Sequence, residues 1–309
     1  MSWTPVALPA PAPNQAYLDV SALDGGRLAC PAWMILSGVP MTSSERLEVP
    51  SLGFLLSHSA SGKKVVYALG MPRLEDLSTL PGFETFAHIY LGDEGKVSPL
   101  RLFTFESDGC VHDSLKKGGV QPEEVDVVVI SHLHWDHVGD ARPFTEAEFI
   151  LGSGAKGITN GEDPQTQSPV VIHVSAPAKR TRFIENWETS IGGLKAHDFF
   201  GDGSVHVLDT TGHLGGHIAF LARTSLDGSW ILLVGDTVHH MSILHGECDF
   251  ACHDNGHGGV LCMHRDPEMA RDTIRKLKAL VDMPRAQLQI ANVNADEGFY
   301  LPVKFAPVT

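Results

Sequence analysis

Short apolar runs recur along the chain, and each is bounded by glycine, proline or polar residues. Many are rich in valine, isoleucine and leucine, as in VVVI at 127–130 and ILLV at 231–234. Runs of this length between turn residues are typical of buried β-strands. The pattern predicts strands over residues 32–37, 52–57, 64–69, 125–131, 148–152, 205–209, 217–222, 230–235 and 288–292.

Two segments carry the signals of helices. Residues 108–118 end near a Gly-Gly pair, which is a common helix stop. Residues 267–281 begin with Pro267 directly after Asp266, a residue that can cap a helix N-terminus. The apolar positions of this second segment recur on one helix face, at Ile274, Leu277, Leu280 and Val281.

The order of these elements favours an α/β fold with two sheets and helices outside them. Strands come first, a helix and further strands follow, and a helix-strand unit comes last. Proline is frequent over residues 5–13, which predicts an extended lead-in. We therefore assign residues 1–29 to an extended N-terminal segment and residues 30–309 to a single domain, because no repeat or linker divides them.

The composition is that of a packed globular protein, with 43% hydrophobic residues among 309. The formal net charge of −14 argues against nucleic-acid binding, which needs a basic face. Five cysteines without a CxxC pair argue for a reducing compartment. The N-terminus lacks a basic start, and no run approaches the ~20 apolar residues that span a bilayer. We expect a soluble, cytoplasmic protein without a membrane or nucleic-acid partner, and its oligomeric state stays open.

The sequence SHLHWDH places three histidines and an aspartate directly after an apolar run. His132 and His134 are two residues apart, so on an extended segment their rings point the same way. Two such imidazoles can bind one cation, and Asp136 and His137 can bind a second cation beside it. Surface histidines on a loop are the plain alternative, but chance rarely produces such a cluster directly after an apolar strand.

The motif at 132–137 resembles the HxHxDH signature of the metallo-β-lactamase superfamily. Two further segments, LDTTGHLGGH at 208–217 and LLVGD at 232–236, follow in the order that the family shows. The resemblance covers the chain from about residue 30 onward. It is strongest to the lactonase-like branch, in particular to fungal lactonases and γ-lactamases that open benzoxazolinone-type rings. The resemblance implies an αββα sandwich of the metallo-β-lactamase type.

The resemblance also implies a metal site. It makes His213 a third ligand beside His132 and His134, and it makes Asp236 a ligand that bridges two metals. The implied set of metal ligands is His132, His134, Asp136, His137, His213 and Asp236. The implied cofactor is zinc, as one or two ions, with manganese or iron as alternatives.

The function that follows is metal-dependent hydrolysis of a small cyclic amide or ester. Candidate substrates are γ-lactams and lactones, with xenobiotic rings among them, and water activated by the metal would attack the ring carbonyl. The expected catalytic residues are Asp136 and Asp236, which orient this water, and His239, which assists at the carbonyl or the leaving group. An iron oxygenase on the same scaffold retains fewer matching features.

Two positions depart from the family pattern. Asn292 stands where family members usually have a histidine ligand at the end of the last core strand, and its amide oxygen is a weaker ligand. Ala68 replaces an aspartate that usually supports the metal loop. These departures leave open a second interpretation, in which the chain is a weakly active or non-catalytic metal-binding relative.

The remaining histidines after Asp236 are expected to pack in loops, although one of them could replace the missing ligand. They are His245, His253, His257 and His264. His217 is expected to buttress the turn after His213 rather than to bind metal.

Overall fold

The computed structural model describes residues 8–80, 103–106, 109–164, 171, 178–226, 228–254, 256, 259–282 and 288–291. Within these ranges, seven strands form one sheet in the order β4-β1-β2-β3-β5-β6-β7. They are β1 (Leu18–Pro31), β2 (Arg46–His58), β3 (Lys64–Tyr67), β4 (Thr104–Glu106), β5 (Val127–Val129), β6 (Glu148–Gly152) and β7 (Thr181–Ile184). Neighbours from β4 to β3 are antiparallel, whereas β3, β5, β6 and β7 run parallel.

A second sheet holds six of the described strands, in the order β15-β12-β11-β10-β9-β8. They are β8 (Thr189–Ile191), β9 (Leu194–Asp198), β10 (Val205–Asp209), β11 (Ile218–Arg223), β12 (Trp230–Leu233) and β15 (Leu288–Ala291). Neighbours are antiparallel except β12 and β15, which run parallel. A separate hairpin joins β13 (Cys252–Asp254) to β14 (Val260–Cys262).

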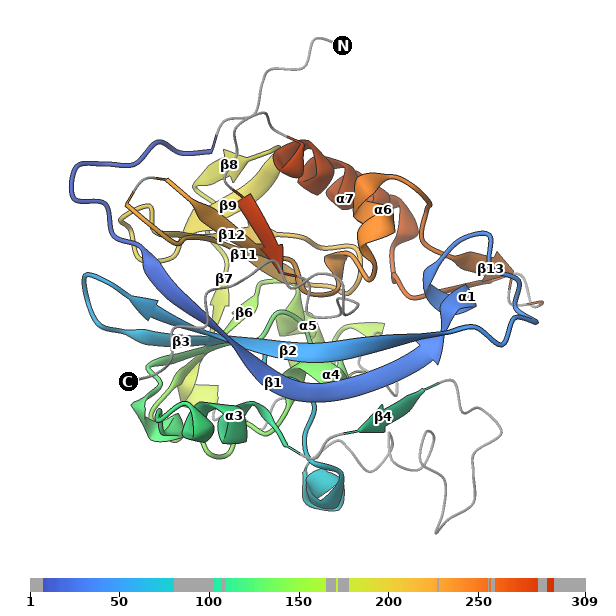
Figure 1. Cartoon of the computed structure of the whole chain (residues 1–309), viewed down its shortest axis with the longest axis horizontal. Helices are drawn as coiled ribbons and strands as arrows, with labels where there is room; N and C mark the ends of the chain where they lie inside the picture. The colour runs from blue at the N-terminus through green and yellow to red at the C-terminus, as the bar shows by residue number, and fades with distance from the viewer. Residues whose placement is uncertain are drawn as a thin grey trace.

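Helices cover the outer sides of the two sheets. The described α-helices are α1 (Ala32–Ile35), α3 (Val111–Lys117), α4 (Trp135–Val138), α5 (Ala155–Thr159), α6 (Met241–His245) and α7 (Pro267–Val281). Short 3₁₀ helices are η1 (Leu74–Thr79), η3 (Pro122–Glu124), η5 (Ala178–Arg180) and η6 (Gly235–Thr237). In Figure 1, α7 lies beyond the second sheet and α3 lies beyond the first, so the predicted αββα sandwich is confirmed. No helix in the described part of the chain combines the length and apolar character that a membrane crossing requires.

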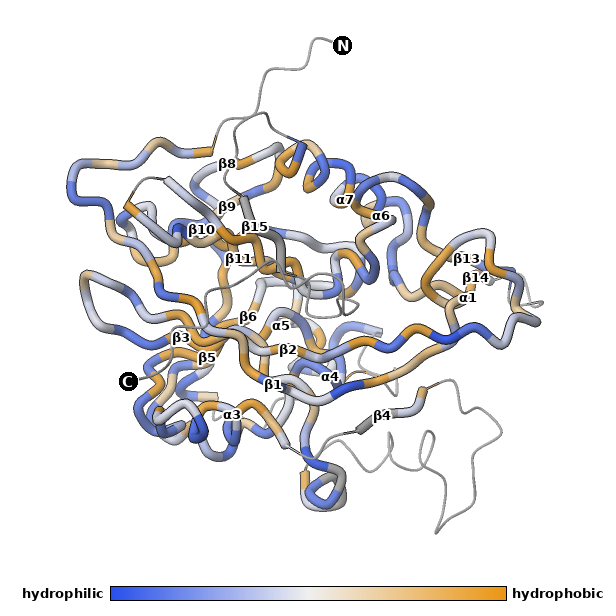
Figure 2. Tube along the Cα trace, in the orientation of Figure 1, coloured by the Kyte–Doolittle hydropathy of each residue, from blue (hydrophilic) through white to orange (hydrophobic). Residues whose placement is uncertain are grey.

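The alternation of side chains along the strands divides the core into two clusters. Val127 and Val129 of β5 join Phe220 of β11 in one cluster, so this cluster lies between the sheets. Val128 points the other way and shares a second cluster with Leu115 of α3. Figure 2 shows apolar stretches along the central strands β3, β5 and β6, and a mixture of hydrophilic and apolar residues along the outer helices.

Several elements form at the bounds that the apolar pattern predicts. Residues 148–152 form β6, residues 205–209 form β10 and residues 267–281 form α7. The start of α7 is capped as expected, because Met269 N–H donates to Asp266 Oδ1 at 3.0 Å. Strong periodicity together with a cap therefore located this helix from sequence alone.

The strand predicted over residues 32–37 is wrong. Its first four residues form the helix α1, and Leu36 N–H donates to Ala32 O at 2.8 Å to close a helical turn. A short apolar run does not by itself distinguish a strand from a buried helix. The expected boundary between residues 29 and 30 falls within β1, which pairs with β2 from Leu18 onward.

Candidate metal centre

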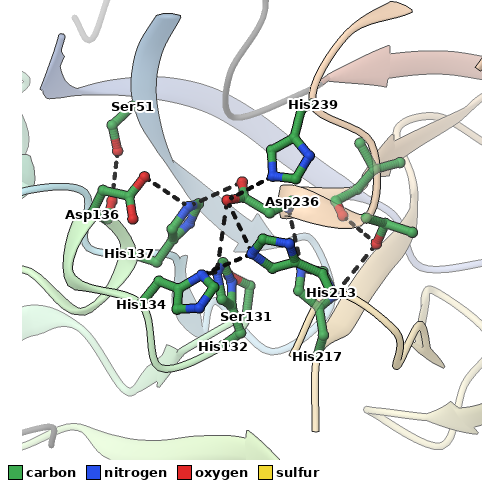
Figure 3. Close-up of polar contacts among 12 residues, drawn as sticks. Ser51, Ser131, His132, His134, Asp136, His137, His213, His217, Asp236 and His239 are labelled. Atoms are coloured by element: carbon green, nitrogen blue, oxygen red, sulfur yellow. Dashed lines mark hydrogen bonds and ion pairs between the residues drawn. The ribbon is translucent and has the colours of Figure 1, made fainter. Parts of the chain in front are cut away.

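Residues from the ends of strands in both sheets meet at one place, as Figure 3 shows. The HxHxDH segment at 132–137 follows β5 of the first sheet and continues into α4. His213 lies between β10 and β11 of the second sheet, and Asp236 lies on η6 after β12. The structure thus brings together all six residues that the sequence analysis names as metal ligands.

The first group consists of three imidazoles and one carboxylate. His134 Nδ1 lies 2.9 Å from His132 Nε2 and 2.8 Å from His213 Nε2. Asp236 Oδ2 lies 3.7 Å from His132 Nε2 and 3.5 Å from His213 Nε2. One ligand atom from each of the four residues falls within 4.8 Å of the others, so a single cation can contact all of them.

The second group lies on the other side of the same carboxylate. His137 Nε2 is 3.1 Å from Asp236 Oδ1 and 3.5 Å from Asp136 Oδ2. Asp236 therefore offers one oxygen to each group. This is the arrangement that a carboxylate needs to bridge two cations, and it links the two groups into one centre.

Burial keeps the imidazoles of the first group neutral. It holds the pKa of His132 and of His213 well below 6.5, and it lowers the pKa of His134 to about 4. Neutral imidazole is the form that ligates metals. Two full hydrogen bonds cannot both explain the contacts of His134 Nδ1, because a ring nitrogen offers either one hydrogen or one lone pair. A cation at the centre would satisfy all three nitrogens at once, so the residues present fit a metal such as zinc.

His137 differs from the other imidazoles of the site. Burial opposes its charge, but the Asp236 and Asp136 carboxylates raise the pKa of His137 to about 10. Burial also acts to raise the pKa of Asp236, yet the His137 charge and hydrogen bond hold that pKa well below 3.8. His137 and Asp236 are therefore an ion pair in this structure, and a cation in the second group would replace the proton on His137.

His217 fixes the position of the bridging carboxylate. Asp236 N–H donates to His217 Nε2 at 3.1 Å, and His217 Nδ1 lies 2.8 Å from Thr210 Oγ1. Burial lowers the pKa of His217 to about 3, so its ring stays neutral and Nε2 remains an acceptor. The ring therefore contacts Thr210 in the loop that carries His213, and it also supports the turn at Asp236, which the sequence analysis does not predict.

Two serines orient the HxHxDH segment. Ser131 Oγ lies 3.1 Å from His132 Nδ1, on the opposite side of the ring from the ligand atom Nε2. Ser51 Oγ of β2 donates to Asp136 O at 2.7 Å and ties α4 to the first sheet. The Ser131 contact sets the ring orientation and the basicity of His132 as a ligand.

The start of α7 holds the loop that carries His213. Arg265 N–H donates to His213 O at 3.0 Å, and Asp266 N–H donates to Gly212 O at 2.9 Å. Gly212 has φ +144°, and a Cβ there would lie 2.6 Å from Ala270 N. Glycine is therefore required for the close approach between this loop and α7.

His239 lies at the edge of the first group, where the sequence analysis expects a substrate-facing residue. Its Nε2 is 3.6 Å from Asp236 Oδ2, and the residue is 4% exposed. His264 is a residue that the sequence analysis assigned to loop packing. Its ring centroid lies 4.9 Å from that of His239 and 5.3 Å from that of His213. No local signal in the sequence marks His264, because its approach depends on how α7 docks.

The other histidines of this region stay apart from the two groups. His253 Nε2 contacts the backbone oxygen of Trp33 at 2.7 Å, and His245 ends α6. His257 lies outside the described residues. The expectation that His245 and His253 pack in loops is therefore wrong, because exposed His245 belongs to α6 and His253 belongs to β13, but neither residue joins a ligand group.

The two departures from the family pattern are Asn292 and Ala68. Asn292 lies outside the described residues. Ala68 is fully buried with φ +61°, and its N–H donates to Val129 O at 2.9 Å. The next residue, Leu69, donates its N–H to His137 O at 2.9 Å. The backbone of Leu69, the residue after Ala68, therefore supports the metal loop, and Ala68 itself brings no carboxylate to it.

Two fungal γ-lactamases are among the known proteins with similar sequences. Gamma-lactamase FDB1 of Fusarium pseudograminearum is 33% identical over 214 residues, which are 65% of this chain and 48% of that protein. Gamma-lactamase MBL2 of Gibberella moniliformis is 33% identical over 184 residues, which are 57% of this chain and 71% of that protein. The chain thus spans about half the length of the first of these relatives.

The fold is shared with a solved structure, and the sequence matches a family model. An N-acyl homoserine lactone hydrolase, solved with N-hexanoyl-L-homoserine bound at its catalytic metal center, superposes with a TM-score of 0.61 at 20% identity. The alignment covers 92% of this chain and 94% of that one, which shows a shared fold. The family model described as metallo-beta-lactamase superfamily matches residues 95–284, more than half of the chain. The chain therefore belongs to the metallo-β-lactamase superfamily.

Proposed function

We propose that this protein is a metal-dependent hydrolase that opens small cyclic amides or esters, namely γ-lactams or lactones. The observation that carries the proposal is the convergence of His132, His134, His213 and Asp236 from the ends of both sheets. The similarity to two fungal γ-lactamases and the fold shared with a lactone hydrolase support a ring-opening reaction. Rings of xenobiotic origin are among the candidate substrates.

The chain's own residues define where the metal would bind. The first group would bind one ion, and Asp136 and His137 with Asp236 would bind a second ion. Zinc suits this mixture of imidazoles and carboxylates, and manganese or iron is an alternative. When bound, such an ion acts as a Lewis acid and makes water a nucleophile at neutral pH.

The side chains around these groups would do the remaining work. The Asp136 and Asp236 carboxylates accept a hydrogen bond from the attacking water and so orient it toward the ring carbonyl. His239, buried beside Asp236, would take up the proton that the attacking water releases and pass it to the leaving atom. An amide nitrogen needs such a proton more than an ester oxygen does, so efficient donation by His239 would favour lactams.

A double substitution tests the proposal. The variant His132→Ala/His134→Ala removes two ligands, and we expect at least a 100-fold loss of hydrolysis on the best ring substrate found in a screen of lactones and lactams. Metal content is measured on the same samples. His206→Ala, which removes a buried histidine outside both groups, is the matched control and should retain hydrolysis. Full activity in the double variant would refute a metal-dependent mechanism.

A second candidate is a weakly active or non-catalytic metal-binding relative. It is favoured by Ala68, which gives the metal loop no carboxylate, and by Asn292 at the expected place of a ligand. The same screen separates the two candidates. Bound metal together with turnover supports the hydrolase, whereas bound metal without turnover on any ring substrate supports the second candidate.

A further inference from the structure

His264 and His239 carry buried ring nitrogens that the two ligand groups leave unused. His264 is 2% exposed and His239 is 4% exposed. Within the described residues, neither nitrogen of either ring has a hydrogen-bond partner, although His239 Nε2 lies 3.6 Å from Asp236 Oδ2. A buried polar atom without a partner is costly, so both His264 nitrogens and His239 Nδ1 favour a ligand between the rings.

These rings form a defined group with His213. One ligand atom from each of His213, His239 and His264 lies within 4.8 Å of the others. The ring centroids of His213 and His239 are 4.8 Å apart. Three imidazoles at this spacing match the requirement of a cation that takes nitrogen ligands.

The surrounding chain holds His264 in this place. The Phe250 ring packs against it with centroids 4.3 Å apart. The following residue, Arg265, donates its N–H to His213 O at 3.0 Å, which ties the backbone beside His264 directly to the first group. The position of His264 is therefore built by α7 and its preceding segment, as is the position of His213.

We propose that His213, His239 and His264 form a further position for a transition-metal cation, beyond the positions that the HxHxDH motif provides. The inference rests on the proposed function only in that the new position adjoins the first group. An all-imidazole set favours zinc, copper or nickel over magnesium or calcium. An ion there would add positive charge at the Oδ2 edge of Asp236, opposite the edge that contacts His137.

His213 belongs to both groups, so the two positions are linked. Its Nε2 faces His134 and Asp236, while its Nδ1 is buried and has no hydrogen-bond partner in the described part of the chain. An imidazole has two nitrogens that can ligate. Zinc in the new position therefore either shares the His213 ring with the first ion or competes for it.

Anomalous diffraction at the zinc edge tests the proposal directly. Crystals of the full chain, stripped with a chelator and then saturated with zinc alone, should show a zinc peak bounded by His213, His239 and His264. A peak there supports the proposal, whether or not the first group is filled at the same time. Zinc confined to the two motif groups at saturation overturns it.

Matched variants give the same answer in solution. His264→Phe keeps a buried ring without ligand atoms, and it should abolish the new peak while the peak at His132 and His134 remains. It should also lower zinc affinity at least 10-fold for the weakest bound ion in chelator competition. His206→Phe, another buried histidine without hydrogen-bond partners in the described chain, should change neither result. If His264→Phe does not fold, His239→Phe removes a different ligand of the same group.

The experiments distinguish failure of this inference from failure of the proposed function. Loss of zinc from the His132 and His134 position, or absence of ring hydrolysis, would count against the proposed function. This inference alone would be overturned by the following result: zinc fills the first group and hydrolysis is normal, but no zinc lies near His264 and His264→Phe does not change zinc affinity.

Discussion

His217 illustrates how a residue that binds no ion can still set the geometry of a metal centre. Its Nε2 accepts the Asp236 N–H, and its Nδ1 meets Thr210 Oγ1, so the ring joins the ends of β10 and β12. The ring thereby fixes the backbone of Asp236, whose carboxylate faces both ligand groups. Contacts of this type commonly change metal affinity by about 10- to 100-fold.

We predict that His217→Leu lowers zinc affinity by about 10- to 100-fold, because the Asp236 backbone loses its acceptor. The measurement is competition with a chromogenic chelator on protein shown to be folded by circular dichroism. His217→Gln offers an amide oxygen near the position of Nε2 and should restore most of the affinity. Equal zinc affinity in the Leu variant and the wild type would contradict the buttressing role.

Asp113 supplies a pH-dependent contribution at another place in the molecule. Arg73 Nε donates to Asp113 Oδ2 at 2.8 Å. Burial acts to raise the pKa of Asp113, but the Arg73 hydrogen bonds lower it from 3.8 to about 2. A depressed pKa stabilises the folded state above pH 3.8, and this stabilisation fades as the pH falls toward 2.

We predict that Asp113→Asn lowers the free energy of unfolding by about 1 kcal/mol at pH 7, a value that allows for solvent screening of the pair. Urea unfolding at pH 7 and at decreasing pH measures the difference, which should shrink below about pH 4. Asp272→Asn, at an exposed pair on α7, is the control and should have a smaller effect. A difference between variant and wild type that stays constant with pH would rule out this origin.

At the scale of elements, the contact between α7 and the His213 loop depends on one glycine. A Cβ at Gly212 would meet the Ala270 backbone, which cannot move aside as a side chain can. The same helix start holds His213 through Arg265. Displacing α7 would therefore disturb stability and the ligand group together.

We predict that Gly212→Ala lowers the free energy of unfolding by about 1–3 kcal/mol more than Gly201→Ala does. Gly201 also has a positive φ, but a Cβ there would meet nothing within 4 Å, so Gly201→Ala is the control for replacing a glycine that has room for a side chain. Urea unfolding of both variants gives the comparison, and zinc affinity should fall only in Gly212→Ala. Equal destabilisation by the two substitutions would mean that the contact with α7 is unimportant.

The local sequence pattern predicts most accurately the helices and strands whose own residues favour that structure. The helix α7 has a capping aspartate, a proline at its first position and a regular apolar face. The segment 32–37 lacks such signals, and its helical turn forms because Ala32 N–H reaches Glu45 O while Leu36 bridges to Phe250. Tertiary contacts of this kind leave no trace in a local pattern.

At the scale of the whole molecule, the centre joins the two halves of the sandwich. The HxHxDH segment follows a strand of the first sheet, whereas His213 and Asp236 belong to the second. The motif and the family resemblance together were enough to name these residues. His264 could not be named, because its proximity to His239 arises from the docking of α7 rather than from any spacing in the sequence.

We predict that zinc stabilises the folded chain through this centre. At a free zinc concentration of 100 times the dissociation constant, the free energy of unfolding should rise by about 2–3 kcal/mol. Thermal unfolding of chelator-treated protein with and without zinc measures the shift. The variant His132→Ala/His134→Ala loses two ligands of the first group and should show a clearly smaller response, and an equal response would place the stabilising ion elsewhere.

The placement of ligands on opposite sheets has a kinetic consequence. The first group does not exist until the sheets have docked, because neither half alone holds its three imidazoles together. An arriving ion thus finds its ligands only near the end of folding. A bound ion should therefore lower the rate of unfolding and extend the lifetime of the protein against proteases. It should leave the rate of folding almost unchanged.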